Sequence, residues 1–386
     1  MDLKLQMLII PISKKLQTTP NRNLCGEKMT EHKIAMVGTP CGIMAASKIQ
    51  HYTETPIYFK IGLFCMENFS YLYFTKLLES IDLTMNDIEK FRIEKGYAFF
   101  NLKNGEQIKI SLSKAKTVVR KNCNICVELT SETSDVSVGS IGSENGWSTV
   151  IIRTEKGEKI IEDAIKQKYL KAKELTPSQL KLLERIASNK AKENLENINE
   201  RESKARPVLY QRDKTDENIL EENSESNFDD LRANVINVGA CVLCGACEYV
   251  CPEDYILIKN TKPRKKRKKC PDDCHMCFTV CPRTFVPIKL RNDISKKIGD
   301  YRKILTVKSL KHNRGQDGVV VTTILDYLIS NNIVTEALIV DKKEDLDWKP
   351  VAKLTKDIDE IVKASGTKYS VCPVFKPLKQ LKKDVI

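Results

Sequence analysis

Apolar residues follow two kinds of pattern in the first part of the chain. The runs KIAMVG (33–38) and YFKIGLFC (58–65) are almost continuously apolar, which predicts buried strands, and a helix-like pattern follows each run. The run GYAFFNLKNGEQIKISL (96–112) alternates instead and contains Asn104-Gly105, which predicts a β-hairpin. Two further apolar strands flank a Gly/Ser-rich loop at 139–147. Because strands and helices alternate, we expect residues 31–165 to form an α/β domain.

Charged residues dominate the middle of the chain. Between Glu155 and Asp230, the segments IIEDAIKQKYLKAKEL and PSQLKLLERIASNKAKENL have helical periodicity, and the polar stretch DENILEENSESNFDD follows them. This pattern predicts exposed helices and then a flexible connection. We therefore expect residues 166–235 to form a charged helical linker.

The last segment, residues 291–386, returns to an α/β pattern. GQDGVVVTTILDYLISNN predicts a glycine turn that opens into a helix, EALIVD predicts a strand, and the final residues predict a basic amphipathic helix. In the N-terminal extension, residues 1–30, the apolar patch is far too short to span a bilayer, and no small-residue cleavage site follows it. We therefore expect a cytoplasmic protein without a membrane span.

Composition narrows the class of protein. The 386 residues, 41% of them hydrophobic, suffice for two or three domains with their own cores and exclude a disordered chain. A formal charge of +13 favours anionic partners, namely nucleic acid, a membrane surface, an acidic protein subunit or a phosphorylated coenzyme. Fourteen cysteines in a long chain without an export signal indicate metal binding or redox chemistry rather than disulfides.

Eight of the cysteines lie in two runs, CVLCGACEYVCP and CPDDCHMCFTVCP. The first run has the spacing C-x2-C-x2-C-x3-C-P, and the second has one extra residue in its first gap. In bacterial ferredoxins with this spacing, three thiolates of one run and the last thiolate of the other hold each 4Fe-4S cluster. We therefore predict a ferredoxin domain of α+β type at 236–290 with two clusters. The first cluster is expected on Cys241, Cys244, Cys247 and Cys281, and the second on Cys270, Cys274, Cys277 and Cys251.

Two features of this region have alternative interpretations. A zinc site would need two C-x2-C pairs without the fourth Cys-Pro, so zinc is the weaker interpretation of the cysteines. The basic run Lys262 to Lys269 between them is either a solvated insertion or a docking surface for an acidic partner or nucleic acid. The absence of interleaved aromatic residues for base stacking favours the solvated insertion.

Beyond the ferredoxin motif, the sequence resembles the beta subunits of coenzyme F-420-reducing hydrogenase, of methanogen formate dehydrogenase and of related F-420 dehydrogenases. The matching stretches are KIAMVGTPC, KIGLFC, CNIC with DVSVGSIGSENGWSTVIIRT, GQDGVVVTTILDYL and GTKYS. In the family the QDG and KY segments precede the VGTPC strand, whereas here they follow it. A circular permutation that still folds, a broken tandem gene, or halves that complement a neighbouring copy would each explain this order. Val319 and Gly42 also replace a family glycine and a frequent glutamine.

The resemblance implies an α/β flavin-binding domain split into two segments, with FAD as cofactor and coenzyme F-420 as substrate. F-420 exchanges a hydride, a 4Fe-4S cluster passes one electron at a time, and a flavin does both, so no catalytic acid, base or nucleophile is expected. The implied residues for FAD lie in glycine-rich turns that let the backbone approach a ligand. They are Gly139, Ser140, Gly142, Ser143, Trp147, Gln316, Asp317, Gly318, Thr367, Lys368 and Tyr369.

The implied partner is a catalytic alpha subunit, either a molybdopterin formate dehydrogenase or a nickel-iron hydrogenase. Because the ferredoxin unit follows the VGTPC half, as in the formate dehydrogenase beta subunit, we favour formate dehydrogenase. Two other functions remain open at this point. One is an electron-carrier iron-sulfur protein whose permuted halves form no flavin site, and the other is an iron-sulfur protein that binds nucleic acid.

Four of the other cysteines lie in the first α/β domain. Cys41 and Cys65 stand at strand ends, and Cys123 and Cys126 form a C-x2-C pair. Because the ends of parallel strands converge at one edge of a sheet, where cofactors commonly bind, we predict that these four thiolates hold a third 4Fe-4S cluster close to the flavin. Reduced core cysteines or a zinc site are the alternatives. Cys25 and Cys372 have no comparable partners and are expected to be spare.

Overall fold

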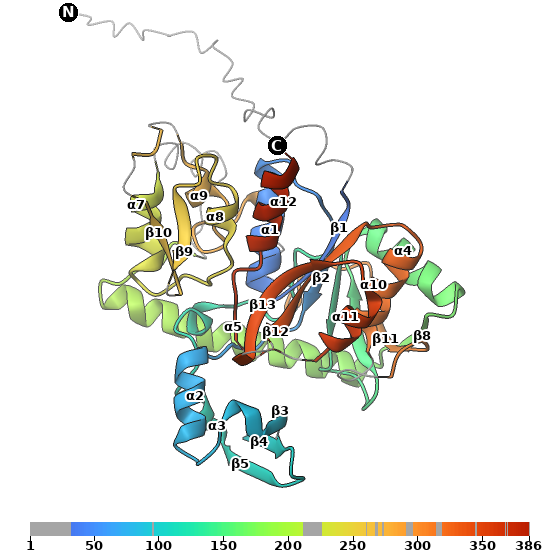
Figure 1. Ribbon diagram of the computed structural model, residues 1–386. Coiled ribbons are helices and arrows are strands. Elements are labelled where there is room, and N and C mark those ends of the chain that lie inside the picture. Colours follow the sequence, from blue (N-terminus) through green and yellow to red (C-terminus); the bar gives the residue numbers. More distant parts are fainter. Residues whose placement is uncertain are drawn as a thin grey trace, which may run out of the picture.

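The protein is described by a computed structural model, which covers residues 32–94, 96–210, 226–259, 261–266, 269–271, 274–290, 296–313, 319–343, 346–366, 368 and 370–385 (Figure 1). Its centre is a mixed eight-stranded sheet. In order across the sheet, the strands are β13 (Leu346–Thr355), β12 (Glu336–Lys343), β1 (Ile34–Gly38), β2 (Ile57–Leu63), β6 (Val136–Gly139), β7 (Ser148–Ile152), β11 (Lys303–Ser309) and β8 (Leu170–Glu174). The pairs from β12 to β6 are parallel, and the others are antiparallel. The α/β architecture and the strands predicted around 33–38, 58–65 and the 139–147 loop are thereby confirmed.

The two segments that stand in reversed order meet in this one sheet. β12 pairs with β1 in parallel, and β11 lies between β7 and β8. Just before β12, the backbone amide of Thr335 donates to the carbonyl oxygen of Lys33 at 2.7 Å. The later segment therefore completes the sheet of the earlier one within a single chain, which is the arrangement expected of a circular permutation that still folds.

Helices cover both faces of the sheet (Figure 1). Successive side chains of a strand point to opposite faces, so Ala35 belongs to one core cluster and its neighbours Ile34 and Met36 belong to another. The core around Ala35 includes residues of α4 (Glu155–Lys166), α10 (Val320–Ser330) and α11 (Ile358–Lys363). The core on the other face includes residues of α1 (Pro40–Tyr52) and α12 (Lys376–Val385).

A small subdomain is inserted between β2 and β6, and it lies apart from the sheet in Figure 1. The predicted hairpin is confirmed as β4 and β5, with Gly105 in the turn at φ +89°. Phe69, Phe74, Phe91 and Phe100 pack together in its core, with Phe91 and Phe100 ring centroids 4.9 Å apart. Its elements are α2 (Tyr71–Glu79), η3 (Met85–Asp87), β3 (Ile88–Glu94), β4 (Tyr97–Leu102), β5 (Gln107–Ser111) and α3 (Leu112–Lys116).

The segment with the two cysteine runs forms a lobe of short elements on the α1 side of the sheet (Figure 1). A short helix follows the first cysteines of each run, and a two-stranded antiparallel hairpin connects the runs. The elements are α7 (Phe228–Leu231), η5 (Arg232–Ile236), α8 (Ala246–Tyr249), β9 (Ile256–Lys259), β10 (Lys262–Lys265), α9 (Met276–Thr279) and η6 (Ile288–Leu290).

The helix expected at 177–195 is present, but the segment before it is a strand and the helix packs on the rest of the protein. β8 is a strand of the main sheet, and α5 (Pro177–Ser203) is a packed helix that starts with a capping box between Thr176 and Gln179. A narrow stripe of α5 is buried: Leu183, Ala187, Lys190, Asn194 and Ile198. These residues recur every three or four positions and therefore lie on one face, while the charged residues between them face solvent. Of the helices in the described part of the chain, none has the length and apolar character needed to cross a membrane.

Candidate functional site

A cavity of about 640 Å³ opens at the carboxyl ends of the four parallel strands. Each of these strands contributes to its wall, with Gly38 from β1, Leu63 from β2, Gly139 from β6 and Val340 from β12. The first turn of α10 and residues 364–366, 368, 370–372 and 374 form another part of the wall. Cofactors in open α/β sheets bind at this position, outside the carboxyl ends of parallel strands. Both segments of the permuted domain are needed to form the cavity.

The four cysteines of the first α/β domain lie together at this edge of the sheet. Cys41 is the second residue of α1, after Pro40, and Cys65 follows β2; both line the cavity. Cys123 begins the short helix η4 (Cys123–Ile125), Cys126 directly follows it, and both are buried. The backbone amide of Asn68 donates to Cys123 Sγ at 3.3 Å, and its side-chain amide donates to Cys65 Sγ at 3.4 Å. The thiols are therefore close neighbours with hydrogen-bond donors directed at their sulfur atoms.

Electrostatics in this group of cysteines favour a thiolate at one position. Burial raises the pKa of Cys65, Lys190 opposes this effect, and the other three cysteines add to it. Burial also acts to raise the pKa of Cys126, but Lys190 and Arg283 outweigh it and hold that pKa below its usual value. A thiolate is the form that binds metals, so the two buried cations prepare this group for a positively charged ligand.

Helix α5 supports the loops that carry these cysteines. Lys190, which is 4% exposed, donates through Nζ to the carbonyl oxygen of Cys65 and to that of Glu128 at 2.7 Å. One turn later, Asn194 Nδ2 donates to the carbonyl oxygens of Cys123 at 3.1 Å and Cys126 at 2.7 Å. The buried polar residues of α5 thus hold the backbone of three of the four cysteines.

Two further cations connect this region with the lobe of the cysteine runs. Arg283 is buried, stacks 4.2 Å from the ring centroid of Tyr210, and donates to the carbonyl oxygen of Asn122 at 3.3 Å. Lys48 on α1 is fully buried and donates to the carbonyl oxygens of Cys281 at 2.6 Å and Phe285 at 2.7 Å. Burial lowers the pKa of Lys48 to about 7, although nearby cysteines oppose the shift.

The eight cysteines of the lobe fall into two groups. Burial raises the pKa of both Cys247 and Cys277, and neighbouring cysteines raise it further. In decreasing order of effect, the neighbours of Cys247 are Cys244, Cys241, Cys281 and Cys277. Those of Cys277 are Cys274, Cys251, Cys270 and Cys281. The structure therefore brings together the cysteines that the spacing assigns to each predicted cluster, with Cys281 and Cys251 each crossing to the other run.

Within the described residues, no three His, Cys, Asp or Glu side chains converge closely enough to hold a single metal ion. A cuboidal cluster makes a different demand, because each of its four thiolates binds a separate iron. A site for such a cluster is characterised by four grouped, buried cysteines with hydrogen-bond donors near their sulfur atoms, rather than by convergence on one ion.

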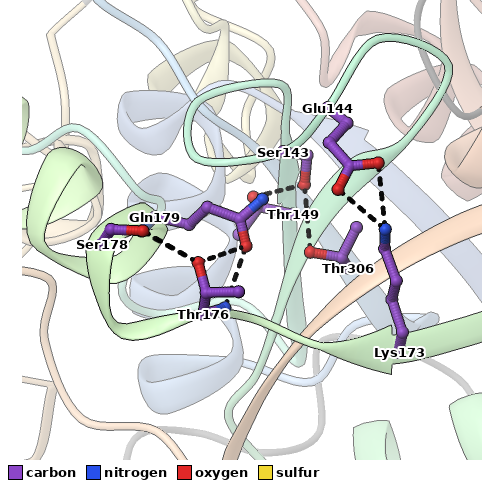
Figure 2. Close-up of polar contacts among 8 residues, drawn as sticks. All are labelled: Ser143, Glu144, Thr149, Lys173, Thr176, Ser178, Gln179 and Thr306. Carbon is purple, nitrogen blue, oxygen red and sulfur yellow. Dashed lines mark hydrogen bonds and ion pairs between the residues drawn. The ribbon is translucent and has the colours of Figure 1, made fainter.

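Only part of the loop predicted to contact a flavin lines the cavity. Gly139 and Ser140 do so, whereas Ser143 is not among the lining residues and its Oγ forms a hydrogen bond with Thr149 Oγ1 at 2.8 Å (Figure 2). The amines of Lys173 and Lys308 lie 4.6 and 4.9 Å from the ring centroid of Trp147.

Packing and backbone conformation explain why two positions of this loop are glycine. A Cβ on Gly139 would meet the ring of Phe64 at 2.1 Å, so packing alone requires this glycine. Gly142 has φ +91° and would place a Cβ 3.1 Å from the carbonyl oxygen of Gln179, at the start of α5 (Figure 2). These glycines therefore give no independent sign of a ligand.

The other predicted flavin residues lie on the second segment. Gln316, Asp317, Gly318, Thr367 and Tyr369 are outside the described residues. Lys368 lines the cavity, but its amine donates to carbonyl oxygens at the end of α11, including that of Gly366 at 3.3 Å, and burial lowers its pKa to about 8. Val319, beside the predicted turn, has φ +53° and also lines the cavity. This left-handed conformation is rare for a β-branched residue.

Sequence reasoning missed Lys48, Lys190, Asn194 and Arg283. Lys190 and Asn194 had a detectable signal, because they continue the helical spacing of the apolar residues Leu183, Ala187 and Ile198. Lys48 and Arg283 had none, since their partners lie far away in the sequence.

Known protein families match the same two segments of the chain that form the main sheet and the cavity. The family model for the C terminus of the coenzyme F-420 hydrogenase/dehydrogenase beta subunit matches residues 31–178, and the model for the N-terminal part of that subunit matches residues 305–379. The coenzyme F-420 hydrogenase subunit beta of Methanococcus voltae is 33% identical over 206 residues, which are 51% of this chain and 74% of that protein. The F-420-dependent formate dehydrogenase subunit beta of Methanocaldococcus jannaschii is 30% identical over 171 residues, 43% of this chain and 45% of that protein.

Among solved structures, a chain of the F-420-reducing NiFe hydrogenase complex from Methanosarcina barkeri is 31% identical, with a TM-score of 0.42 over 45% of this chain and 62% of that chain. The two family models match in the order opposite to their names, with the C-terminal part first. The chain therefore belongs to the beta-subunit family of coenzyme F-420 hydrogenases and dehydrogenases, with the two family segments in reversed order.

Proposed function

We propose that this protein is an oxidoreductase subunit that transfers electrons between coenzyme F-420 and a partner enzyme, with FAD in the cavity and three 4Fe-4S clusters on its cysteines. One observation carries the proposal. The wall of a single cavity contains both family segments and also Cys41 and Cys65. A cofactor in this cavity would therefore lie beside the ligands of the nearest predicted cluster.

The residues around the cavity are suitable for FAD. A volume of about 640 Å³ lies in the range of cofactor sites, and apolar residues such as Leu63, Val138 and Leu325 line it and exclude water. The N-terminal turn of α10 borders it and offers backbone amides to an anionic group. When bound, FAD supplies the conversion between hydride transfer and single-electron transfer.

The cysteine groups are suitable for 4Fe-4S clusters. Cys41, Cys65, Cys123 and Cys126 would hold the cluster beside the cavity, and the two groups in the lobe would hold the others. Lys190 and Arg283 stabilise negative charge at the first group, and the amides of Asn68 point to two of its sulfur atoms. Hydrogen bonds to the ligand sulfurs are a recognised means of stabilising the reduced cluster.

The partner is proposed to be the catalytic subunit of a formate dehydrogenase. Two observations support this choice of partner. The ferredoxin segment follows the VGTPC half in the sequence, and a formate dehydrogenase subunit beta is among the relatives. A hydrogenase subunit beta is also among them, so the catalytic subunit of a hydrogenase is the second candidate. Pull-down of each type of catalytic subunit with this chain distinguishes the two, and capture of the hydrogenase subunit alone would overturn the choice of formate dehydrogenase.

The decisive experiment measures cofactors and activity in the same sample. Protein purified without oxygen is expected to contain FAD, about 12 iron atoms per chain, and F-420-reducing activity with reduced viologen as electron donor. Cys41→Ser protein is expected to retain about eight iron atoms. Unchanged iron in this variant would reject the third cluster, and absence of activity in protein replete with clusters and FAD would reject the enzymatic function.

The alternative function is that of an electron-carrier protein without a flavin. The reason for considering it is that a permuted order of segments can disrupt a site made from both of them. Since both segments line one cavity, that reason no longer favours it. Absence of flavin absorption bands from protein with a full iron content would restore this alternative.

A further inference from the structure

The β9–β10 hairpin connects Cys251 with Cys270, which belong to the same predicted cluster. In its antiparallel register, Lys262 stands opposite Lys259, and Arg264 stands opposite Leu257. The first four residues of the basic run, 262–265, therefore lie on a regular two-stranded ribbon. This ribbon is a part of the chain that the proposed function leaves unused.

The ribbon presents its charges to solvent on one side. In β10, Pro263 is buried, and the half-buried Lys265 turns the same way and pairs with Asp229 at 2.8 Å. Lys262 and Arg264 alternate with them and are exposed. Lys259 and Lys266 are also exposed. These four residues, Lys259, Lys262, Arg264 and Lys266, are called the basic face below.

The basic face is costly to the fold. Like charges directly opposite each other in an antiparallel ladder are destabilising, and Lys259 and Lys262 form such a pair. Within the described part of the chain, no carboxylate forms an ion pair with Lys259, Lys262 or Arg264. Lys265 supplies the ion pair that anchors the ribbon, and it lies on the other side. The exposed cations are therefore better explained by an anionic partner than by folding.

The basic face lies at the far end of the series of cysteine groups. Cys41 and Cys65 of the first group and Cys244 of the second group line the cavity, whereas none of Cys251, Cys270, Cys274 and Cys277 does. The group of Cys277 interacts with the group of Cys241 through Cys247 and Cys281. The ribbon connects Cys251 with Cys270 of this last group, which is the farthest from the cavity in the series. Because electron transfer slows steeply with distance, a protein docked on the ribbon would exchange electrons with this group first.

We propose that the basic face docks a small acidic one-electron carrier protein, which exchanges single electrons with the cluster on Cys251, Cys270, Cys274 and Cys277. The proposal rests on the proposed function, because it requires that cluster. In each step the carrier loses one electron and the cluster gains it, or the reverse, and no bond or proton moves. An acidic protein is favoured over nucleic acid because neither β9 nor β10 contains an aromatic side chain on which a base would stack.

The test compares two charge-reversed forms of the full chain, loaded with its clusters and FAD. One form has Lys259→Glu, Lys262→Glu and Arg264→Glu. The control has Lys103→Glu, Lys181→Glu and Lys192→Glu, three exposed residues on other elements with the same total change in charge. Stopped-flow absorption measures cluster reduction by a chemically reduced, acidic bacterial ferredoxin and, separately, by reduced methyl viologen.

Reduction by the ferredoxin is expected to be about tenfold slower in the first form than in the control, and to slow in the unmodified chain as salt rises from about 20 to about 300 mM. Reduction by viologen is expected to be equal in all forms. Equal ferredoxin rates in the two forms would overturn the docking proposal. Failure of viologen to reduce the unmodified chain would overturn the proposed function itself and with it this proposal.

Two measurements separate docking from misfolding and from nucleic-acid binding. Equal iron and acid-labile sulfide in both forms shows that the first form is folded, and the milder Lys262→Gln is expected to slow the ferredoxin reaction in the same direction. Retention of a single-stranded oligonucleotide by the unmodified chain, lost in the first form while ferredoxin rates stay equal, would overturn the proposal in favour of nucleic acid.

Discussion

The side-chain amine of Lys190 donates a hydrogen bond to the backbone carbonyl of Cys65, which lies 125 positions earlier in the chain. The same amine donates to the carbonyl of Glu128, so one buried cation joins α5 to two loops of the cysteine group. A buried lysine is costly unless its charge is compensated. Here the compensation comes from carbonyl oxygens and from thiols that ionise when they bind metal, which couples the stability of α5 to the state of the site.

Lys190→Met is expected to weaken the cluster predicted beside the cavity. The substitution leaves two buried carbonyls without their donor, which costs about 3 kcal/mol of the free energy of unfolding, and removes a cation that lowers the pKa of Cys126. Iron should fall from about 12 to about eight atoms per chain. Lys192→Met on the exposed side of α5 serves as the control and should change stability by less than about 0.5 kcal/mol. Full iron in the Lys190 variant would contradict this role.

Arg283→Met is expected to lower the reduction potential of the clusters on either side of this residue. The guanidinium lies in electrostatic reach of Cys41 and Cys126 on one side and of Cys241 on the other. Its positive charge stabilises an added electron, so its loss should lower the potential by roughly 60 mV, equivalent to a tenfold change in the equilibrium. Redox titration followed by electron paramagnetic resonance measures the shift. Arg283→Lys keeps the charge and should keep most of the potential, and an equal shift in both variants would point to packing instead.

Local patterns were sufficient to predict the strands and the hairpin. The apolar run at 33–38 needs only burial to become β1, and Asn104-Gly105 supplies the positive φ of the hairpin turn. These features depend on neighbours in the sequence. The grouping of the lobe cysteines does not, because Cys281 lies near the first run and Cys251 near the second, and the binding of clusters there stays a prediction.

The parts that were not predicted depend on distant contacts. α5 appeared to be an exposed linker because its buried stripe is narrow and includes Lys190 and Asn194, whose partners are backbone carbonyls from 65 to 128. The packing of the Phe64 ring on Gly139 could not be predicted either, because a glycine in the sequence carries no sign of a neighbour 75 positions away. The meeting of both reversed segments in one sheet was one of three possibilities until strand pairing was known.

Val319→Gly is expected to strengthen FAD binding at little cost in stability. Val319 is held at φ +53°, a conformation that costs a residue with a Cβ about 1–2 kcal/mol and that glycine adopts freely. Relief of this backbone strain offsets the loss of the buried valine side chain and the greater backbone entropy of glycine in the unfolded chain. The free energy of unfolding should therefore change by less than about 1 kcal/mol. FAD should bind up to about tenfold more tightly, because the backbone beside α10 becomes accessible.

Val321→Gly provides the matched control, since Val321 also lines the cavity but lies inside α10 with no positive φ. This change should destabilise the protein by about 1 kcal/mol or more. Fluorescence titration of apoprotein with FAD and urea unfolding measure both quantities. Equal FAD affinity and equal free energy of unfolding in the two variants would show that the backbone conformation of Val319 does not limit FAD binding.

Lys60→Met should remove a component of stability that depends on pH. The amine of Lys60 donates to Ser47 Oγ at 2.8 Å, and burial lowers its pKa to about 8, while Asp135 opposes the shift. An unfolded chain has a lysine pKa of about 10.4, so between pH 8 and about 10.4 the unfolded state binds a proton that the folded state has released. The free energy of unfolding therefore rises with pH in this window, by up to about 1.4 kcal/mol per pH unit and on the order of 3 kcal/mol in total.

Below pH 8 both states of the unmodified chain hold the Lys60 proton, and the full cost of burying the charge is present. The methionine variant should consequently be more stable than the unmodified chain at pH 7, and the difference should shrink toward pH 10. Anaerobic urea unfolding at several pH values measures it, with Lys159→Met on the exposed side of α4 as the control. Parallel pH curves for the unmodified chain and the Lys60 variant would show that Lys60 stays protonated in the folded protein.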